Sequence, residues 1–226
     1  MKKVLLVALM AVFTSSAFAQ ILTGKSAALV KENNNWSYVY LQYNAGSFSP
    51  DKGDSENFNA VSLGWNKNIR LTSSLPLYLE TGLGLQFSFS SESESDKYYE
   101  VEENTFLMSV KVPVGVSYAF DIPNAPVAVI PTAGLDLRFN AVGTYKYEET
   151  DKYYDETDSE TINLFDKDDM GGSDYTWNRF QIGAHIGVNA RFWNKLLVGY
   201  AYQFDFSEIS KKTHINQHNI TIGYCF

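Results

Sequence analysis

Several segments of the chain alternate between apolar residues and residues that are small or polar. Seven charged side chains stand among the small and polar ones. They are Glu80, Lys111, Asp136, Arg138, Arg179, Arg191 and Asp205, and His185 shares their phase. Such groups can pair with one another, line a narrow channel or serve as acid–base groups. Because an unpaired charge away from water is very costly, we expect the three acids to be partners of the four bases in a packed polar interior.

A second group of reactive side chains lies near the C-terminus. His214 and His218 follow Ser207, Glu208 and Ser210. A hydrolytic or acyl-transfer site requires a nucleophile beside a base. Because this spacing matches no such motif, we predict polar residues at a rim and no catalytic residues, with a lipid-modifying enzyme as one alternative.

The segment 144–175 is strongly acidic and contains few lysines. Its acids are Glu148, Glu149, Asp151, Asp155, Glu156, Asp158, Glu160, Asp166, Asp168, Asp169 and Asp174. Residues 166–171 are similar to a calcium loop, but Met170 stands at the fifth position and Trp177 at the twelfth, where oxygen ligands are required. We therefore predict a solvated loop with neither a metal site nor a cofactor. Bridging of these carboxylates to lipid phosphates by divalent cations is a separate hypothesis.

The elements that would position these residues are β-strands, because apolar and polar residues alternate after Gln20. Eight strands are predicted, at 35–44, 58–66, 77–90, 106–120, 127–141, 176–192, 196–206 and in a last segment that ends at 220–226. In the first strand, either Tyr38 and Tyr40 or Val39 and Leu41 face outward. Pro113 and Pro131 fall inside strands, where we expect bulges or bends.

The two faces of the predicted strands indicate an inside-out barrel. The apolar face is bulky and nearly free of charge, whereas the other face carries the seven charges, which is typical of a barrel in lipid. Long connections at 48–56, 91–103 and 144–175 alternate with short ones at 71–75, 121–126 and 193–194, as in outer-membrane barrels. Aromatic residues on the apolar face form two predicted bands, one with Trp65, Phe120, Phe192 and Tyr224, the other with Phe87, Phe89, Phe106, Phe139, Phe204 and Phe206.

The N-terminus predicts export. Lys2 and Lys3 precede an apolar run over 4–13, and Ala17-Phe18-Ala19 forms a cleavage site, so residues 1–19 are predicted to be a signal peptide and 20–226 the barrel domain. The full chain has a formal charge of −8, and removal of the two lysines makes it −10. Such an acidic chain is a poor nucleic-acid binder, because phosphate contacts need a basic patch.

The C-terminal residues carry a family resemblance. Ile220, Ile222, Tyr224 and Phe226 alternate up to a terminal aromatic residue, which resembles the terminal signal of bacterial outer-membrane proteins. That resemblance implies recognition by the outer-membrane insertion machinery. The stretch 77–84 is similar to the small porin-like outer-membrane β-barrel domain family, with the eight-stranded layout of OmpA- and OmpX-type barrels, and members of this family often have no established transport activity.

These observations predict an all-β, eight-stranded antiparallel up-and-down transmembrane barrel in the bacterial outer membrane. Its lumen is expected to be filled by side chains, because an eight-stranded barrel is only wide enough for them. The expected role is structural or interactive, and the expected partners are outer-membrane lipids and a surface partner of unknown identity bound through the acidic loops. A narrow pore for small solutes and an enzyme at the rim are the alternatives.

Overall fold

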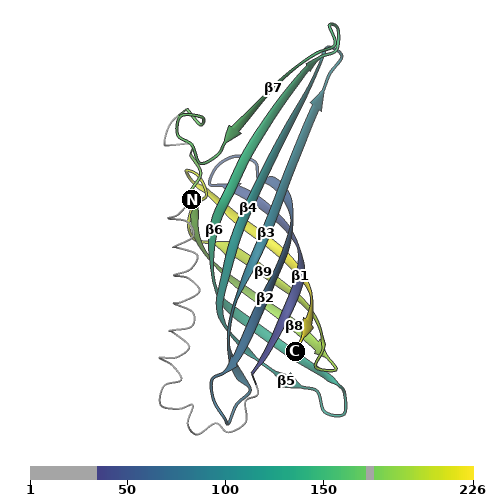
Figure 1. The fold of residues 1–226 in the computed structure, drawn as a ribbon, viewed down its shortest axis with the longest axis vertical. Helices are drawn as coiled ribbons and strands as arrows, with labels where there is room; N and C mark the ends of the chain where they lie inside the picture. The colour runs from purple at the N-terminus through teal and green to yellow at the C-terminus, as the bar shows by residue number, and fades with distance from the viewer. Residues whose placement is uncertain (1–34, 172–175) are drawn as a thin grey trace.

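A computed structural model describes residues 35–171 and 176–226 (Figure 1), so the predicted signal peptide over 1–19 lies outside the described residues. All named elements are strands: β1 (Trp36–Pro50), β2 (Glu56–Arg70), β3 (Leu77–Ser95), β4 (Tyr99–Tyr118), β5 (Phe120–Asp121), β6 (Val127–Asp151), β7 (Glu156–Asn163), β8 (Phe180–Phe192), β9 (Leu196–Asp205) and β10 (Thr213–Cys225). In the described ranges no helix has the length and apolar character needed to cross a membrane.

Eight of these strands close into a ring. Their order is β4-β3-β2-β1-β10-β9-β8-β6, and pairing of β4 with β6 completes the circle, with every neighbouring pair antiparallel. The two-residue β5 continues the line of β4, and β7 pairs with the far part of β6. The predicted eight-stranded up-and-down barrel is therefore confirmed.

The barrel has its apolar residues outside and its polar residues inside. Exposed outward positions include Leu63, Leu85, Val116, Ile186 and Ile222, whereas the buried interior positions include Asn44, Ser62, Gln86, Ser109, Gln203 and Asn219. The first strand follows the same rule, because Leu41 is 59% exposed and Tyr38 only 4%. An outward apolar belt of this kind is the surface that a barrel presents to lipid.

Tyr40 can also face inward because two glycines leave room for its ring. A Cβ atom placed on Gly64 or Gly84 would lie 2.6 Å or 2.4 Å from the Tyr40 hydroxyl oxygen. Gly64 stands on β2, which pairs with β1, and Gly84 stands on β3, the next strand of the ring, so the hydroxyl end of the Tyr40 ring lies against the inner wall of both strands. The small residues on the inner face thus make space for aromatic rings in a narrow lumen.

The two strand prolines do not produce the expected bulges. Pairing of β3 with β4 stops at Thr81 and Val114 and resumes in the same register at Gly84 and Lys111, so Pro113 only interrupts the ladder. The physical reason is that proline has no backbone N–H to donate. Pro131 keeps its pairing with Val188, and the register shift of β4 against β6 falls elsewhere, between Met108 and Ser109.

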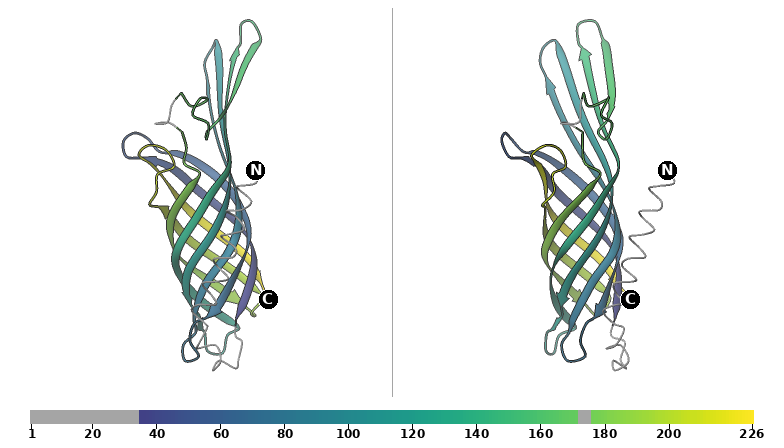
Figure 2. Two further views of the ribbon diagram at one scale, coloured as in Figure 1. Left: turned by 60° about the vertical axis from the view of Figure 1, so that its left-hand side comes forward. Right: turned by 90° about the vertical axis from the view of Figure 1, so that its left-hand side faces the viewer.

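The largest departure from the sequence prediction concerns the segments 91–103 and 144–175. Much of both is strand, because β3 and β4 continue to a turn at 96–98 while β6 continues to Asp151 and returns as β7. The four strands form a sheet that projects well beyond the ring (Figures 1 and 2). We call residues 90–105 and 144–163 the blade, the barrel end that carries it the hairpin end, and the opposite end the turn end.

Replacement of Leu41 by Arg tests the assignment of the outer face. Leu41 is exposed and pairs with Leu63 and Ile222, so the charge would enter the apolar belt. We expect Leu41→Arg to lower the free energy of unfolding by about 2–4 kcal/mol in lipid vesicles, measured by denaturant titration. Leu41→Ile serves as the control. An arginine variant as stable as this control would contradict lipid contact at this position.

Candidate functional site

The middle of the lumen holds a polar cluster around Glu80. Its carboxylate accepts hydrogen bonds from Tyr38 Oη at 2.6 Å, Asn66 Nδ2 at 2.8 Å and Thr132 Oγ1 at 3.1 Å. These donors come from β1, β2 and β6, so the cluster ties opposite parts of the ring together. It borders a cavity of about 70 Å³, which has room for only a few water molecules.

Two further contacts border the same cavity. Asp136 Oδ2 lies 2.8 Å from His185 Nδ1, which joins β6 to β8. Lys111 Nζ donates to Gln203 Oε1 at 2.7 Å and so links β4 to β9 across the lumen. His185 therefore enters the lumen cluster, as its shared phase with the charged residues indicated.

A buried ion pair forms the next layer toward the hairpin end. Arg138 Nη1 lies 3.0 Å from Asp205 Oδ2, and the side chains of both residues are 1% exposed. Asp205 also accepts a hydrogen bond from Gln203 Nε2 at 3.3 Å, which connects this pair to Lys111. The lumen thus contains a continuous polar network that begins at Lys111 and ends at Arg138.

The remaining predicted network residues lie elsewhere or find other partners. Arg179 is exposed at the hairpin end, where it donates to the carbonyl oxygens of residues 140 and 141 and stacks on Phe165. Arg191 lies over the ring of Trp36, with 4.7 Å from its guanidinium carbon to the ring centroid. Glu80 is held by neutral donors, so the expected pairing of all three acids with the four bases is not what the structure contains. The reason is that Arg179 and Arg191 stand near strand ends, beyond reach of the central acids.

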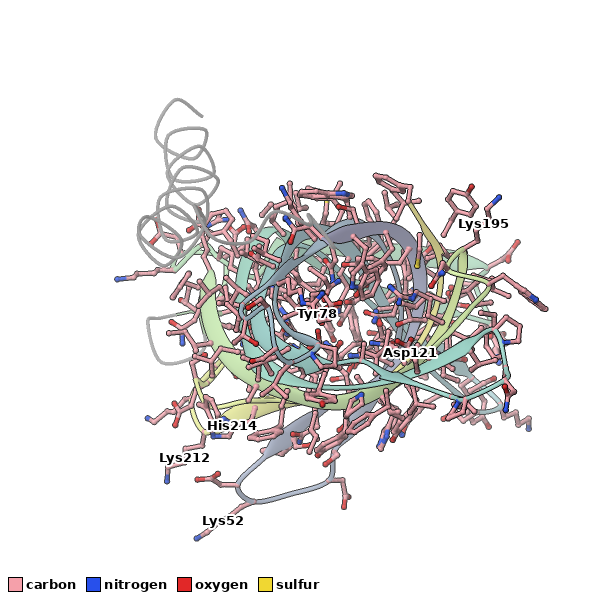
Figure 3. The ribbon with its side chains drawn as sticks, turned by 90° about the horizontal axis from the view of Figure 1, so that it is seen from below. Lys52, Tyr78, Asp121, Lys195, Lys212 and His214 are labelled. Atoms are coloured by element: carbon pink, nitrogen blue, oxygen red, sulfur yellow. The ribbon has the colours of Figure 1, made fainter. Side chains whose placement is uncertain are left out.

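Buried apolar clusters lie near both ends of the barrel, a feature that the alternation did not predict. At the hairpin end, Phe48, Phe58, Leu107, Ile209 and Ile215 form a buried cluster against which Phe165 and Trp177 pack. At the turn end, Tyr78, Ala119, Ala128 and Ile130 form a second cluster with Trp36. Seen along the barrel, Tyr78 projects into the ring of strands, whereas His214 lies outside it (Figure 3).

The candidate catalytic residues near the C-terminus do not assemble into a nucleophile–base pair in the described part of the chain. His218 faces outward, with its Nδ1 2.8 Å from the hydroxyl of Tyr200. Ser207 accepts the backbone N–H of Ile182, and Ser210 forms an isolated bridge with Thr213. The four residues of the predicted insertion signal, Ile220, Ile222, Tyr224 and Phe226, are all more than half exposed on the outer wall. Across the two described ranges, no group of three His, Cys, Asp or Glu residues could hold a metal ion.

The two faces of the blade differ sharply in charge. Ser90 and Leu107 are buried in the lumen, and successive side chains of a strand point to opposite faces. Counting outward from these two residues through the strand pairs gives an inner face, which continues the lumen wall, and an outer face, which continues the apolar belt. The inner face carries eight acids: Glu92, Glu94, Glu103, Glu149, Asp151, Glu156, Asp158 and Glu160. The outer face carries serines, threonines and ion pairs of Lys146 with Glu148 and of Lys152 with Glu100. The outer face also carries Glu102, so it has three acids against two lysines and is nearly balanced, whereas the inner face is strongly negative.

Tyr145 lies at the base of the acidic face. Burial and a hydrogen bond to Glu103 raise the pKa of its phenol to about 12. The neighbouring carboxylates of Glu103 and Glu56 favour the neutral phenol as well, since a phenolate would be repelled by them. The inner face of the blade thus disfavours additional negative charge.

The two blade hairpins end in the same four residues, Asp-Lys-Tyr-Tyr, at 96–99 and 151–154. In each, the aspartate carboxylate accepts two backbone N–H groups, from Tyr98 and Tyr99 in one tip and from Tyr153 and Tyr154 in the other. These hydrogen bonds hold the pKa of the Asp96 carboxyl below its usual value. All four tyrosines are exposed. The repeat is visible in the sequence, but four residues without apolar alternation carry no strand signal that would mark them as hairpin tips.

A family model described as outer membrane protein beta-barrel domain matches residues 5–226. The chain belongs to this family. Membership implies residence in the bacterial outer membrane, in agreement with the outward apolar belt. No curated protein matches the chain in sequence.

Several solved outer-membrane barrels resemble this family member. The attachment invasion locus protein Ail of Yersinia pestis has 11% identity and a TM-score of 0.42, with 85% of this chain and 99% of that chain covered. Neisserial surface protein A has 12% identity and a TM-score of 0.39, with 84% and 97% covered. The outer membrane enzyme PagL has 11% identity and a TM-score of 0.36, with 80% and 97% covered. Similarity at this level carries no argument about activity.

The buried pair of Arg138 and Asp205 gives a stability prediction. We expect Asp205→Leu to lower the free energy of unfolding by about 3–5 kcal/mol, because it leaves the arginine unpaired in the lumen. The double variant Arg138→Met with Asp205→Leu should recover most of this loss. Denaturant unfolding in lipid vesicles measures both.

The exposed pair of Lys146 and Glu148 supplies the matched control for that series. Its side chains are 46% and 31% exposed, so Lys146→Met should cost less than about 1 kcal/mol. If Asp205→Leu costs no more than this control, the lumen pair is exposed to water and the packed interior is wrong.

Proposed function

We propose that this protein is an outer-membrane barrel with a side-chain-filled lumen that acts at the cell surface by binding a partner through its blade. The observation that carries the proposal is the blade itself, a four-stranded sheet with one acidic face and two tyrosine-bearing tips. A sheet that contributes little to the barrel core and presents so much unbalanced charge is suited to recognition of a partner.

The filled lumen supports the first half of the proposal. Apolar clusters lie near both ends, and the polar network between them borders a cavity of about 70 Å³. Conduction needs a continuous water-filled path with sites that ions enter and leave. The geometry therefore favours a closed barrel over a narrow pore, and a binding role over transport.

The charge of the blade supports the second half and indicates the chemistry of the partner. Eight carboxylates on one face set up a negative potential that raises the local concentration of cations and steers basic molecules toward it. The tyrosines at the tips supply amphipathic rings that contact a partner at low entropic cost. A basic polypeptide is the class of partner that fits both features.

Planar-bilayer recording tests the closed lumen. The refolded, purified barrel should give no steady conductance, because the apolar clusters and the Arg138 layer block the path. A general porin inserted in the same way is the positive control. Steady conductance that scales with salt concentration would overturn the closed-lumen proposal and make Lys111, Asp136 and Arg138 pore-lining residues.

Binding of a fluorescent oligolysine peptide to the barrel in zwitterionic nanodiscs tests the blade. We expect salt-sensitive binding that is weakened at least about tenfold by Glu103→Gln, Glu149→Gln and Glu160→Gln together, since three carboxylates leave the inner face.

A matched control comes from the opposite face of the same sheet. Glu100→Gln, Glu102→Gln and Glu148→Gln remove the same charge from the outer face and should weaken binding much less. Equal losses in the two triple variants would show that only net charge matters, and the inner face would then have no special role.

A further inference from the structure

The band of aromatic residues at the hairpin end is interrupted over three adjacent strands. Exposed or half-buried aromatic residues lie on the outer wall of β3, β4, β8 and β9, namely Phe89, Phe106, Phe180 and Phe204, and Phe206 directly follows β9. On β10, β1 and β2 the corresponding outward positions carry His218, Ala45 and Asn59, followed by Asn216, Ser47 and Asn57. One sector of the interfacial band is thus polar and made of small residues.

Cross-strand register places this sector between aromatic residues on either side. A single row runs from Tyr202 through His218, Ala45 and Asn59 to Phe89. Ala45 is the smallest side chain in the row and stands in its middle. The outer wall is therefore hollowed here, and the hollow has a volume of about 380 Å³.

The row next to it, toward the turn end, is apolar or aromatic and contains Tyr200, Ile220, Tyr43 and Val61, all of which are exposed. The hollow consequently begins where the apolar belt ends. This is the depth at which the headgroup of a lipid meets its acyl chains. A molecule with an apolar tail and a polar head would contact both rows at once.

The polar groups of the hollow are arranged to bind hydroxyl groups. Tyr43 donates to Asn59 Oδ1 at 2.5 Å, which leaves the amide N–H groups of Asn59 available. The Tyr200 hydroxyl oxygen lies 2.8 Å from His218 Nδ1 and forms a hydrogen bond with it, which leaves Nε2 of His218 available. The amide of Asn57 is exposed and forms no side-chain hydrogen bond within the residues that the structure describes.

The hollow contains no Asp, Glu, Lys or Arg. Proteins bind phosphate chiefly through arginine, lysine or clustered backbone N–H groups. Neither arginine nor lysine lines the hollow. Amide groups, one imidazole and the ring of Tyr202 instead suit a neutral ligand rich in hydroxyl groups. The rings give an apolar surface for C–H groups, and the amides give directional hydrogen bonds.

We propose that this hollow binds the saccharide headgroup of a glycolipid in the membrane leaflet at the hairpin end. The acyl chains of the lipid lie on the row of Tyr43 and Ile220, and its sugar contacts Asn57, Asn59 and His218. The inference rests on insertion of the barrel in a membrane and is independent of the partner proposed for the blade.

Selective retention of a glycolipid tests the site. The full mature barrel is refolded into phosphatidylcholine vesicles that contain a minor fraction of digalactosyldiacylglycerol with the same acyl chains, and the lipid retained after mild detergent extraction is quantified by mass spectrometry. If the sugar forms two hydrogen bonds with the hollow that phosphatidylcholine does not form, the galactolipid should be enriched over its bulk fraction roughly fivefold or more. Heat-dependent gel mobility and protease protection establish separately that each sample is folded and inserted.

Two variants and a control complete the experiment. Ala45→Phe fills the hollow and should abolish the enrichment, whereas Thr144→Phe adds the same bulk to the outer wall of β6, beside Phe106, and should leave it unchanged. Asn57→Ala removes an exposed amide without an internal partner, so it should fold normally and reduce the enrichment about twofold or more. Equal retention of the two lipids by the inserted wild type would overturn the proposal, as would an enrichment that survives Ala45→Phe and Asn57→Ala.

Discussion

Closure of the strand ring is the constraint on which the rest of this structure depends. In a membrane each backbone N–H and C=O group needs a partner within the protein, and only a closed barrel gives a sheet without edges. Pairing of β1 with β10 and of β4 with β6 provides that closure. Once the ring is closed at eight strands, its interior is narrow, and the alternation of side chains decides which ones enter it. The lumen network and the outward apolar belt both follow from this single step.

The narrow interior also explains how the polar residues are used. A charge enclosed there is stable only with partners at short range, and Arg138 with Asp205 meets this condition at 3.0 Å. Glu80 meets it differently, through the neutral donors Tyr38, Asn66 and Thr132. The ring of Tyr40 fits in the same space because glycine lines the wall beside it, at Gly64 and Gly84. Apolar clusters lie near both ends of the barrel, with the polar network between them.

Outside the lumen the constraint is relaxed, and the molecule presents two different surfaces, one on the blade and one on the outer wall of the barrel. The blade is wet on both faces, so its side chains are free to segregate by charge, and the acids gather on the face that continues the lumen wall. The outer wall of β10, β1 and β2 meets the boundary between lipid tails and headgroups, and there a hollow replaces the aromatic band. We propose a basic polypeptide for the first surface and a glycolipid headgroup for the second, because one is strongly charged and the other uncharged.

The sequence by itself determined the elements in which one face is buried in lipid and the other in the lumen. The alternation over 77–90 and the terminal run of Ile220, Ile222, Tyr224 and Phe226 predicted strands and their facing correctly, since period two is strongest where the two faces meet different surroundings. The same reasoning explains the failure in the blade, where both faces meet water and the serine- and glutamate-rich strands give no such signal. Tertiary structure alone decided the pairing of Arg138 with Asp205, the exclusion of Arg179 and Arg191 from the network, and the facing of Tyr38. These depend on register across three or more strands, which alternation within one strand does not specify.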